Sequence, residues 1–119
     1  MCLYPVDRAG NLTVIRLPAE VDISTADQLR EELLSVIDEG AAVLIVDMSA
    51  TTFCDSAALS ALIIAHKRAA AAAAELRLVA TSAGVLRVMK LTGVDRLISL
   101  YPTLAAAQAG HAEPGPVTE

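Results

Sequence analysis

The chain is poor in several kinds of residue, and each shortage narrows its function. It has no tryptophan, only 3% aromatic residues, and 9 basic against 14 acidic side chains, a formal net charge of −5. Nucleic-acid binding usually needs a basic face and stacking rings, so we expect no nucleic-acid partner. The two cysteines, Cys2 and Cys54, lie far apart without metal-ligand spacing. We therefore expect a reducing cytoplasm and no metal or other cofactor.

Long apolar runs are also missing. No uninterrupted apolar stretch reaches the roughly 18–20 residues that a membrane-spanning helix needs, and the best candidate, 57–74, is interrupted at 66–68 by His-Lys-Arg. Residues 1–20 lack the basic and apolar regions of a signal peptide. We expect a protein without a membrane partner, with one domain over 1–109 and a disordered tail over 110–119, where periodicity is absent.

The order of the remaining patterns predicts an α/β fold. Residues 3–17 are typical of a hairpin with its turn at 7–11, and Ser24 with Asp27 fits a helix capping box. The run 41–48 lacks polar alternation, which is typical of a strand covered on both faces. The other expected elements are a loop over 19–23, a helix over 57–74, strands over 76–79 and 94–100, a short helix from 85 closed by Gly93, and a helix over 104–109. We expect a single domain with a mixed β-sheet, built from the hairpin plus alternating strands and helices, and about four helices packed on it.

An acid and a hydroxyl, Asp55 and Ser56, lie where the strand 41–48 gives way to the helix 57–74. The first backbone N–H groups of a helix have no partner in a preceding turn. We therefore expect both side chains on an exposed helix N-terminus, where a small modification would change the local charge most. Ser56 has two interpretations: a modification site, or simply the N-cap, since serine is favoured there for its hydrogen bond.

The helix that follows is unusually apolar. A helix that lies on a sheet usually carries charge on its outer face, but the only polar residue between 57 and 65 is Ser60. Ile64 falls outside the expected buried stripe, on the same side as Ala57 and Ala61. This side is either an exposed apolar surface that docks a partner, or alanine filler in which only Ile64 needs an explanation.

Three stretches resemble the STAS-domain anti-sigma factor antagonists of bacteria. Residues 14–22 are similar to the family's apolar strand followed by Gly-Glu-x-Asp, and residues 46–59 contain a sequence similar to its Asp-Ser-[Ser/Thr]-Gly-Leu motif. Residues 88–94 are similar to a helix end that reads Leu-x-Leu-Thr-Gly-Leu. With the matching order of elements, the resemblance covers about residues 10–108. None of the three stretches is specific alone, but all three in this order and spacing make a strong resemblance.

The resemblance implies a switch protein and not an enzyme. In the family, the unmodified domain binds an anti-sigma factor that has ATP-dependent serine kinase activity, and a sigma factor is released. Phosphorylation of the serine after the aspartate ends the binding, and a phosphatase restores it. By position, Ser56 is implied to be the phosphoacceptor. The residues expected to contact the partner are Glu20, Asp22, Ser24, Asp55, Ser56, Ala57, Ser60 and Ile64.

Several details have two interpretations. Two glycines of the family pattern are Ala19 and Ala58 here; alanine suits a helical position, whereas glycine would be needed for a positive φ or the close approach of a partner. Glu20 and Asp22 either help to hold the Mg²⁺–ATP of a docked kinase or form a solvated acidic loop. Cys54 is either a redox switch or, as is commoner, a buried small apolar residue.

Two other functional classes are relevant to parts of this sequence. Asp55, Ser56 and His66 are the residue types of a hydrolase triad, but His66 lies roughly 15 Å further along the predicted helix, and the Gly-x-Ser-x-Gly elbow is absent. We therefore expect no intrinsic catalysis. The other class is an accessory STAS subunit of a transporter or of a larger signalling assembly, without a phosphorylation switch. A neighbouring gene for an anti-sigma kinase or for a transporter would distinguish the two.

Overall fold

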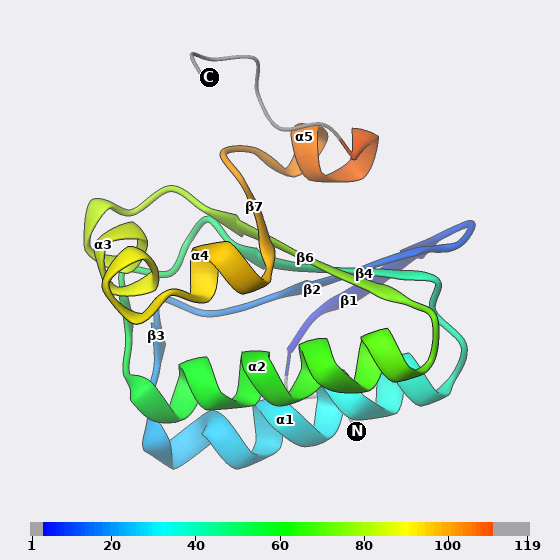
Figure 1. Cartoon of the computed structure of the whole chain (residues 1–119), viewed down its shortest axis with the longest axis horizontal. Coiled ribbons are helices and arrows are strands. Elements are labelled where there is room, and N and C mark those ends of the chain that lie inside the picture. Colours follow the sequence, from blue (N-terminus) through cyan, green and yellow to red (C-terminus); the bar gives the residue numbers. More distant parts are fainter. Residues whose placement is uncertain (1–3, 111–119) are drawn as a thin grey trace.

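The computed structural model describes residues 4–110, which form a mixed five-stranded sheet with helices on both faces (Figure 1). The strand order is β1-β2-β4-β6-β7, in which β1 runs antiparallel to β2 and the other neighbours pair in parallel. The strands are β1 Val6–Ala9, β2 Leu12–Arg16, β3 Glu20–Val21, β4 Val43–Met48, β5 Phe53–Cys54, β6 Glu75–Ala80 and β7 Ser99–Tyr101. The helices are α1 Ile23–Asp38, α2 Ser56–Ala71, α3 Ala83–Thr92, α4 Val94–Leu97 and α5 Leu104–Ala109.

Both faces of the sheet are buried at β4, which explains the apolar run of this strand. Leu44, Val46 and Met48 belong to the main core, which contains residues of α1, α2, α3 and α4. Ile45 belongs to a smaller core that contains residues of α5. Figure 1 agrees, with α1 and α2 side by side along one face of the sheet and α5 on the other. The prediction of a strand covered on both faces is confirmed.

The segment 19–23 contains a strand, so the prediction of a loop is wrong. Glu20 pairs with Phe53 and Val21 with Cys54, in a separate two-stranded parallel sheet of β3 and β5. The Thr51 hydroxyl reinforces the pair by donating to the Pro18 carbonyl at 2.7 Å. A strand of two residues has no local periodicity, and its partner is remote in sequence. Because β3 leads into α1 and β5 into α2, the two helices begin at the same end of the molecule (Figure 1).

Three further predictions need correction. The hairpin turn is shorter than 7–11, because the sequence continues as β1 to Ala9 and only Gly10 and Asn11 turn. The strand predicted over 94–100 begins only at Ser99, because α4 occupies Val94–Leu97. Val94 and Ile98 are both buried, one helical turn apart, and this spacing favours a helix over a strand. With α4, residues 4–110 contain five helices, one more than expected.

Two helix boundaries in the C-terminal part follow the prediction. Gly93 ends α3 with a left-handed φ of +82°, and Thr103 caps α5 by accepting the Ala106 N–H at 3.0 Å. Gly110 is the C-cap of α5, and the rest of the predicted tail lies outside the described residues. Within residues 4–110, no helix combines the length and apolar character that crossing a membrane requires.

Candidate functional site

Ser56 is the first residue of α2, and its side chain is exposed. The N-cap is the preceding residue, Asp55, whose Oδ1 accepts the N–H of Ala58 at 3.1 Å. The interpretation of Ser56 as the N-cap is therefore wrong. Its hydroxyl makes no hydrogen bond with any other residue of the described part of the chain. The position thus combines an exposed helix N-terminus with a hydroxyl that the fold does not use.

Asp55 also joins α2 to α1. Its second oxygen, Oδ2, accepts the backbone N–H of Ile23, the first residue of α1, at 3.0 Å. One carboxylate therefore satisfies an otherwise unpaired N–H group at the start of each helix. The Asp55 N–H in turn donates to the Val21 carbonyl at 3.3 Å, next to the β3–β5 pair. These bonds fix the two helix N-termini beside each other.

Asp22 caps α1, so the predicted capping box of Ser24 and Asp27 is wrong. Asp22 Oδ1 accepts the backbone N–H of Ser24 at 2.9 Å and also the Ser24 hydroxyl. Because β3 holds Val21 extended, the helix begins earlier than the hydroxyl pattern indicated. Asp27 instead lies 3.7 Å from Arg30, one turn along α1. The Ser24 hydroxyl and N–H lower the pKa of the Asp22 carboxyl, which is ionised at neutral pH.

Cys54 is buried in the main core, with 5% of its surface exposed. Burial, and to a smaller extent the charge of Asp55, raises the pKa of its thiol. A protonated and inaccessible thiol is a poor nucleophile. These features favour the interpretation of Cys54 as a buried apolar residue over a redox switch.

Three of the expected partner residues, Ala57, Ser60 and Ile64, line a groove between the first halves of α1 and α2. Its volume is about 360 Å³, and it is lined by Ile23, Ala26, Asp27, Arg30, Ala57, Ser60, Ala61 and Ile64. Ile64 is 40% exposed, as expected for a residue outside the buried stripe, but Ala61 is buried, so its predicted place on the outer side is wrong. Ser60 is exposed and Ala57 is half-buried, one turn or less from Ser56.

The remaining predicted residues lie at the same end of the molecule. Glu20 and Ser24 are exposed, Asp22 and Asp55 are half-buried, and all four belong to β3, β5 or the helix starts that follow them. Whether Glu20 and Asp22 assist a bound Mg²⁺–ATP stays a prediction. Within residues 4–110, no group of three or more His, Cys, Asp or Glu side chains is arranged to hold a metal ion.

Two exposed apolar residues near Ser56 are not predicted from the sequence. Ile23 is 77% exposed at the start of α1, and Phe53 is 51% exposed in β5. Neither residue has a local sequence pattern that predicts its exposure. Ile23 ends the predicted loop 19–23, and Phe53 lies in the predicted turn between the strand 41–48 and the helix 57–74. Phe53 directly precedes the cap of α2 in the chain, and the β3–β5 pairing together with the Asp55 bond brings Ile23 to the same helix start.

The two alanines at family glycine positions need no special backbone. Ala58 lies in the first turn of α2 and is fully buried. Among the non-glycine residues from 4 to 110, only Ala73 has a positive φ, so neither Ala19 nor Ala58 requires the conformations that favour glycine. The backbone at both positions therefore accommodates alanine without strain.

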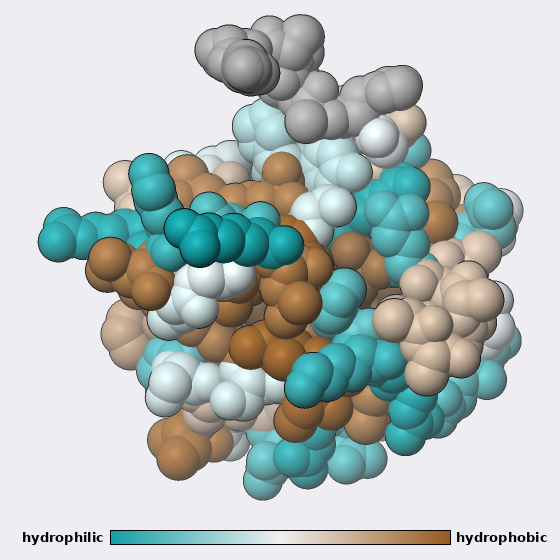
Figure 2. Space-filling view, viewed as in Figure 1, coloured by the Kyte–Doolittle hydropathy of each residue, from teal (hydrophilic) through white to brown (hydrophobic). Residues whose placement is uncertain are grey.

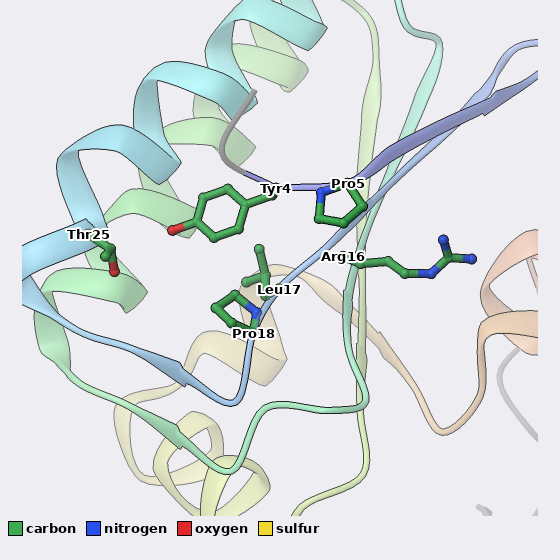
Figure 3. Close-up of a pocket in the computed structure, with 6 residues that line it drawn as sticks. All are labelled: Tyr4, Pro5, Arg16, Leu17, Pro18 and Thr25. Atoms are coloured by element: carbon green, nitrogen blue, oxygen red, sulfur yellow. The ribbon is translucent and has the colours of Figure 1, made fainter. Parts of the chain in front are cut away.

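A larger hollow, of about 500 Å³, lies away from Ser56. It is lined by Tyr4, Pro5, Arg16, Leu17, Pro18 and Thr25 (Figure 3). The Tyr4 hydroxyl points toward Thr25, whereas the Arg16 side chain points away, where it pairs with Asp7 and Asp47. Burial raises the pKa of Tyr4. The hollow contains no residue of α2, and none of the predicted site residues lines it.

Known proteins resemble this chain in sequence and in fold. The family model of the STAS domain matches residues 4–107. The anti-sigma-F factor antagonist RsfB of Mycobacterium tuberculosis is 27% identical over 101 residues, which cover 85% of this chain and 82% of that protein. The structure of an anti-sigma factor antagonist from Mycobacterium paratuberculosis superposes with a TM-score of 0.83, at 27% identity, over 90% of this chain and 91% of that one.

A second solved structure shares the fold at lower identity. The anti-sigma factor antagonist SpoIIAA in its unphosphorylated form superposes with a TM-score of 0.77 at 22% identity, over 97% of this chain and 99% of that one. The predicted α/β fold, with its mixed sheet, is therefore confirmed by the structure and by these neighbours. Since the family model matches almost the whole described part, the chain belongs to the STAS domain family.

Proposed function

We propose that this protein is a cytoplasmic anti-sigma factor antagonist with no catalytic activity of its own. Unphosphorylated, it binds an anti-sigma factor that has serine kinase activity, and a sigma factor is released; phosphorylation of Ser56 ends the binding. The observation that carries the proposal is the state of Ser56. Its exposed hydroxyl stands at the start of α2 with no hydrogen bond inside residues 4–110, next to Ala57, which lines the groove between α1 and α2.

The chemistry of the step is a phosphoryl transfer by the partner. The Ser56 oxygen attacks the γ-phosphorus of the kinase-bound ATP, the bond to the β-phosphate oxygen breaks, and ADP leaves. The hydroxyl proton passes to a base of the kinase or to water. A separate phosphatase later hydrolyses the phosphate ester and restores the hydroxyl. The antagonist itself only needs to present an unhindered hydroxyl.

The fold tolerates the modification because its cap is a different residue. Asp55 accepts the N–H groups of Ala58 and Ile23, and a phosphate on Ser56 removes neither acceptor. The phosphate adds about −1.5 to −2 charge at pH 7. At a helix N-terminus an exposed anion is favourable by roughly 0.3–1 kcal/mol, whereas the neighbouring carboxylate of Asp55 repels it. These two opposed effects leave the domain folded.

The phosphate has a larger effect on partner binding than on the stability of the fold. The groove beside Ser56 is flanked by the exposed side chains of Ile23 and Ile64, so a partner that fills it must approach Ser56 closely. A doubly charged, hydrated group is costly to bury in such a contact unless the partner offers a cationic pocket. The phosphorylated form therefore dissociates.

Calorimetry of the wild-type protein, Ser56→Ala and Ser56→Asp with the cognate anti-sigma factor tests this proposal. We expect Ser56→Ala to bind like the wild type and Ser56→Asp to bind at least about tenfold more weakly. The melting temperatures of all three should be similar. Equal affinities would exclude the switch and leave Ser56 as an ordinary surface residue.

A further inference from the structure

The arginines and lysines of this chain are unevenly paired. All nine lie within residues 4–110. Five form ion pairs with carboxylates, namely Arg8, Arg16, Arg30, Arg68 and Arg77. The other four have neither an ion pair nor a side-chain hydrogen bond within the described part of the chain. Three of these four, Arg87, Lys90 and Arg96, lie on α3 and α4, in a protein whose formal net charge is −5.

The same two helices expose large apolar side chains. Leu91 is 75% exposed and Leu97 is 46% exposed, and both are neighbours in sequence of an unpaired cation. Figure 2 shows hydrophobic side chains gathered over α3 and α4 and crossed by hydrophilic ones. We refer to Arg87, Lys90, Leu91, Arg96 and Leu97 as the α3–α4 surface.

Local structure explains only part of this arrangement. Lys90 and Arg96 each lie in the last turn of a helix, where a cation is favourable by about 0.3–1 kcal/mol. That effect does not extend to Arg87, and it does not explain why two leucines stay exposed. The lone carboxylate on these helices, Asp95, lies in the first turn of α4 and pairs with none of the three cations. The α3–α4 surface therefore keeps a local positive charge beside apolar area.

We propose that the α3–α4 surface docks an acidic segment of a partner protein, one that carries apolar side chains between its carboxylates. We place this segment on the anti-sigma factor, and to that extent the inference rests on the proposed function. Carboxylates would pair with Arg87, Lys90 and Arg96, while apolar side chains cover Leu91 and Leu97. Charge complementarity of this kind raises association rates more than it raises affinity.

The composition argues for a protein partner over the two other polyanions. Polybasic segments that bind anionic membranes usually carry 4–8 cations, more than the three of the α3–α4 surface, and the remainder of this acidic chain would be repelled. Nucleic-acid surfaces need a larger basic area and usually stacking rings, and no aromatic residue lies on α3 or α4. A short acidic segment matches both the charge and the leucines.

The location permits one partner to contact this surface and Ser56 together. Gly84, in the first turn of α3, faces the Thr52 carbonyl just before β5, and β5 leads directly into the cap of α2. Figure 1 places α3 and α4 at the same end of the molecule as the start of α2. Phe53, which is exposed in β5, lies in the chain between Thr52 and that cap. The two regions are thus connected through β5.

The test compares two charge reversals with the same anti-sigma factor. The double variant Arg87→Glu/Lys90→Glu alters the α3–α4 surface, and Lys67→Glu reverses the unpaired cation outside it, on α2. We expect the double variant to reduce the association rate constant about tenfold at low salt, with the difference shrinking as salt rises. Lys67→Glu should change the rate constant less than about twofold. The side chains are exposed, so melting temperatures should stay close to that of the wild type.

A peptide probe separates this inference from the proposed function. A synthetic peptide of alternating glutamate and leucine should perturb the backbone NMR signals of residues 87–97 in the wild type but not in the double variant, and the same peptide with glutamine for glutamate should not. This result supports the α3–α4 surface even if the Ser56 variants bind equally. Equal rate constants for both charge reversals, or peptide signals elsewhere, would overturn it. Binding to phosphatidylglycerol vesicles without peptide binding would also overturn it, in favour of a lipid surface.

Discussion

The starts of α1 and α2 are built alike, but they differ in what their serines do. Each helix follows a short strand of the β3–β5 pair, and each has an aspartate at its N-cap, Asp22 or Asp55. The Ser24 hydroxyl of α1 donates to Asp22, whereas the Ser56 hydroxyl of α2 has no partner in the described chain. This difference is why we propose Ser56, and not Ser24, as the modified residue: the Ser24 hydroxyl has a structural role to lose, and the Ser56 hydroxyl has none.

The two N-cap aspartates also differ in the number of helices that they bond to. This difference gives the largest expected effect on stability. Asp22 binds the N–H and hydroxyl of Ser24, within its own helix, whereas Asp55 binds N–H groups of both helices. Removal of an N-cap costs about 0.5–2 kcal/mol, and a second unsatisfied N–H adds about 1 kcal/mol. We expect Asp55→Ala to lower the free energy of unfolding by about 1.5–3 kcal/mol, and Asp22→Ala to lower it by less. Urea denaturation of the two variants measures both values, and an equal loss would contradict the role of Asp55 as a joint between the helices.

The next largest effect is expected for the apolar residues that flank the groove on α1 and α2. Ile64→Asp should weaken binding to the anti-sigma factor about tenfold or more while the melting temperature changes little, because Ile64 is 40% exposed and packs outside the core. Ile23→Asp, on α1, should act in the same direction. Ala61→Asp is the matched control from the buried side of the groove, and it should unfold the domain. If Ile64→Asp unfolds the domain as well, Ile64 is a core residue and the groove is no docking site.

The smallest expected effect concerns the carboxyl of Asp22. Its folded pKa is lowered, so its contribution to stability is complete above the pKa of about 3.9 that an unfolded aspartate has, and is lost as the pH falls through the lowered folded value. The Ser24 hydroxyl is the largest cause of the shift, so Ser24→Ala should raise the pKa of Asp22. Ser56→Ala should leave it where it is. Titration of the Asp22 carboxyl carbon by NMR measures each case, and an unchanged pKa in Ser24→Ala would contradict the assigned hydrogen bond.

How far the sequence predicts this molecule depends on how local each signal is. Gly93 and Thr103 marked the end of one helix and the start of another correctly, because left-handed glycines and hydroxyl caps act within a few residues. The cap of α1 was misplaced because the pairing of β3 with β5, which joins segments remote in sequence, decides where that helix begins. The motif resemblance indicates Ser56, but its hydroxyl is unused because the neighbouring Asp55 is the N-cap, and the sequence pattern leaves open which of the two residues caps the helix.

The same limit applies to surfaces. The exposure of Ile64 followed from helical periodicity, whereas Ile23 and Phe53 lie in or next to the short β3–β5 pair, which joins segments remote in sequence. The unpaired cations of α3 and α4 could not be recognised in the sequence, where Asp95 stands next to Arg96. Other cations pair with carboxylates that are remote in sequence, such as Arg8 with Glu39 and Arg68 with Asp38. Within residues 4–110, the three cations of α3 and α4 have no such partner, and neither has the lysine of α2.

Phosphate mapping with the cognate anti-sigma factor tests the difference between the two serines most directly. Wild-type protein, Ser24→Ala and Ser56→Ala are each incubated with that factor and Mg²⁺–ATP, and phosphorylated peptides are identified by mass spectrometry. We predict one phosphate, on Ser56, in the wild type and in Ser24→Ala, and none in Ser56→Ala. Phosphate on Ser24, or continued phosphorylation of Ser56→Ala at another residue, would contradict the account.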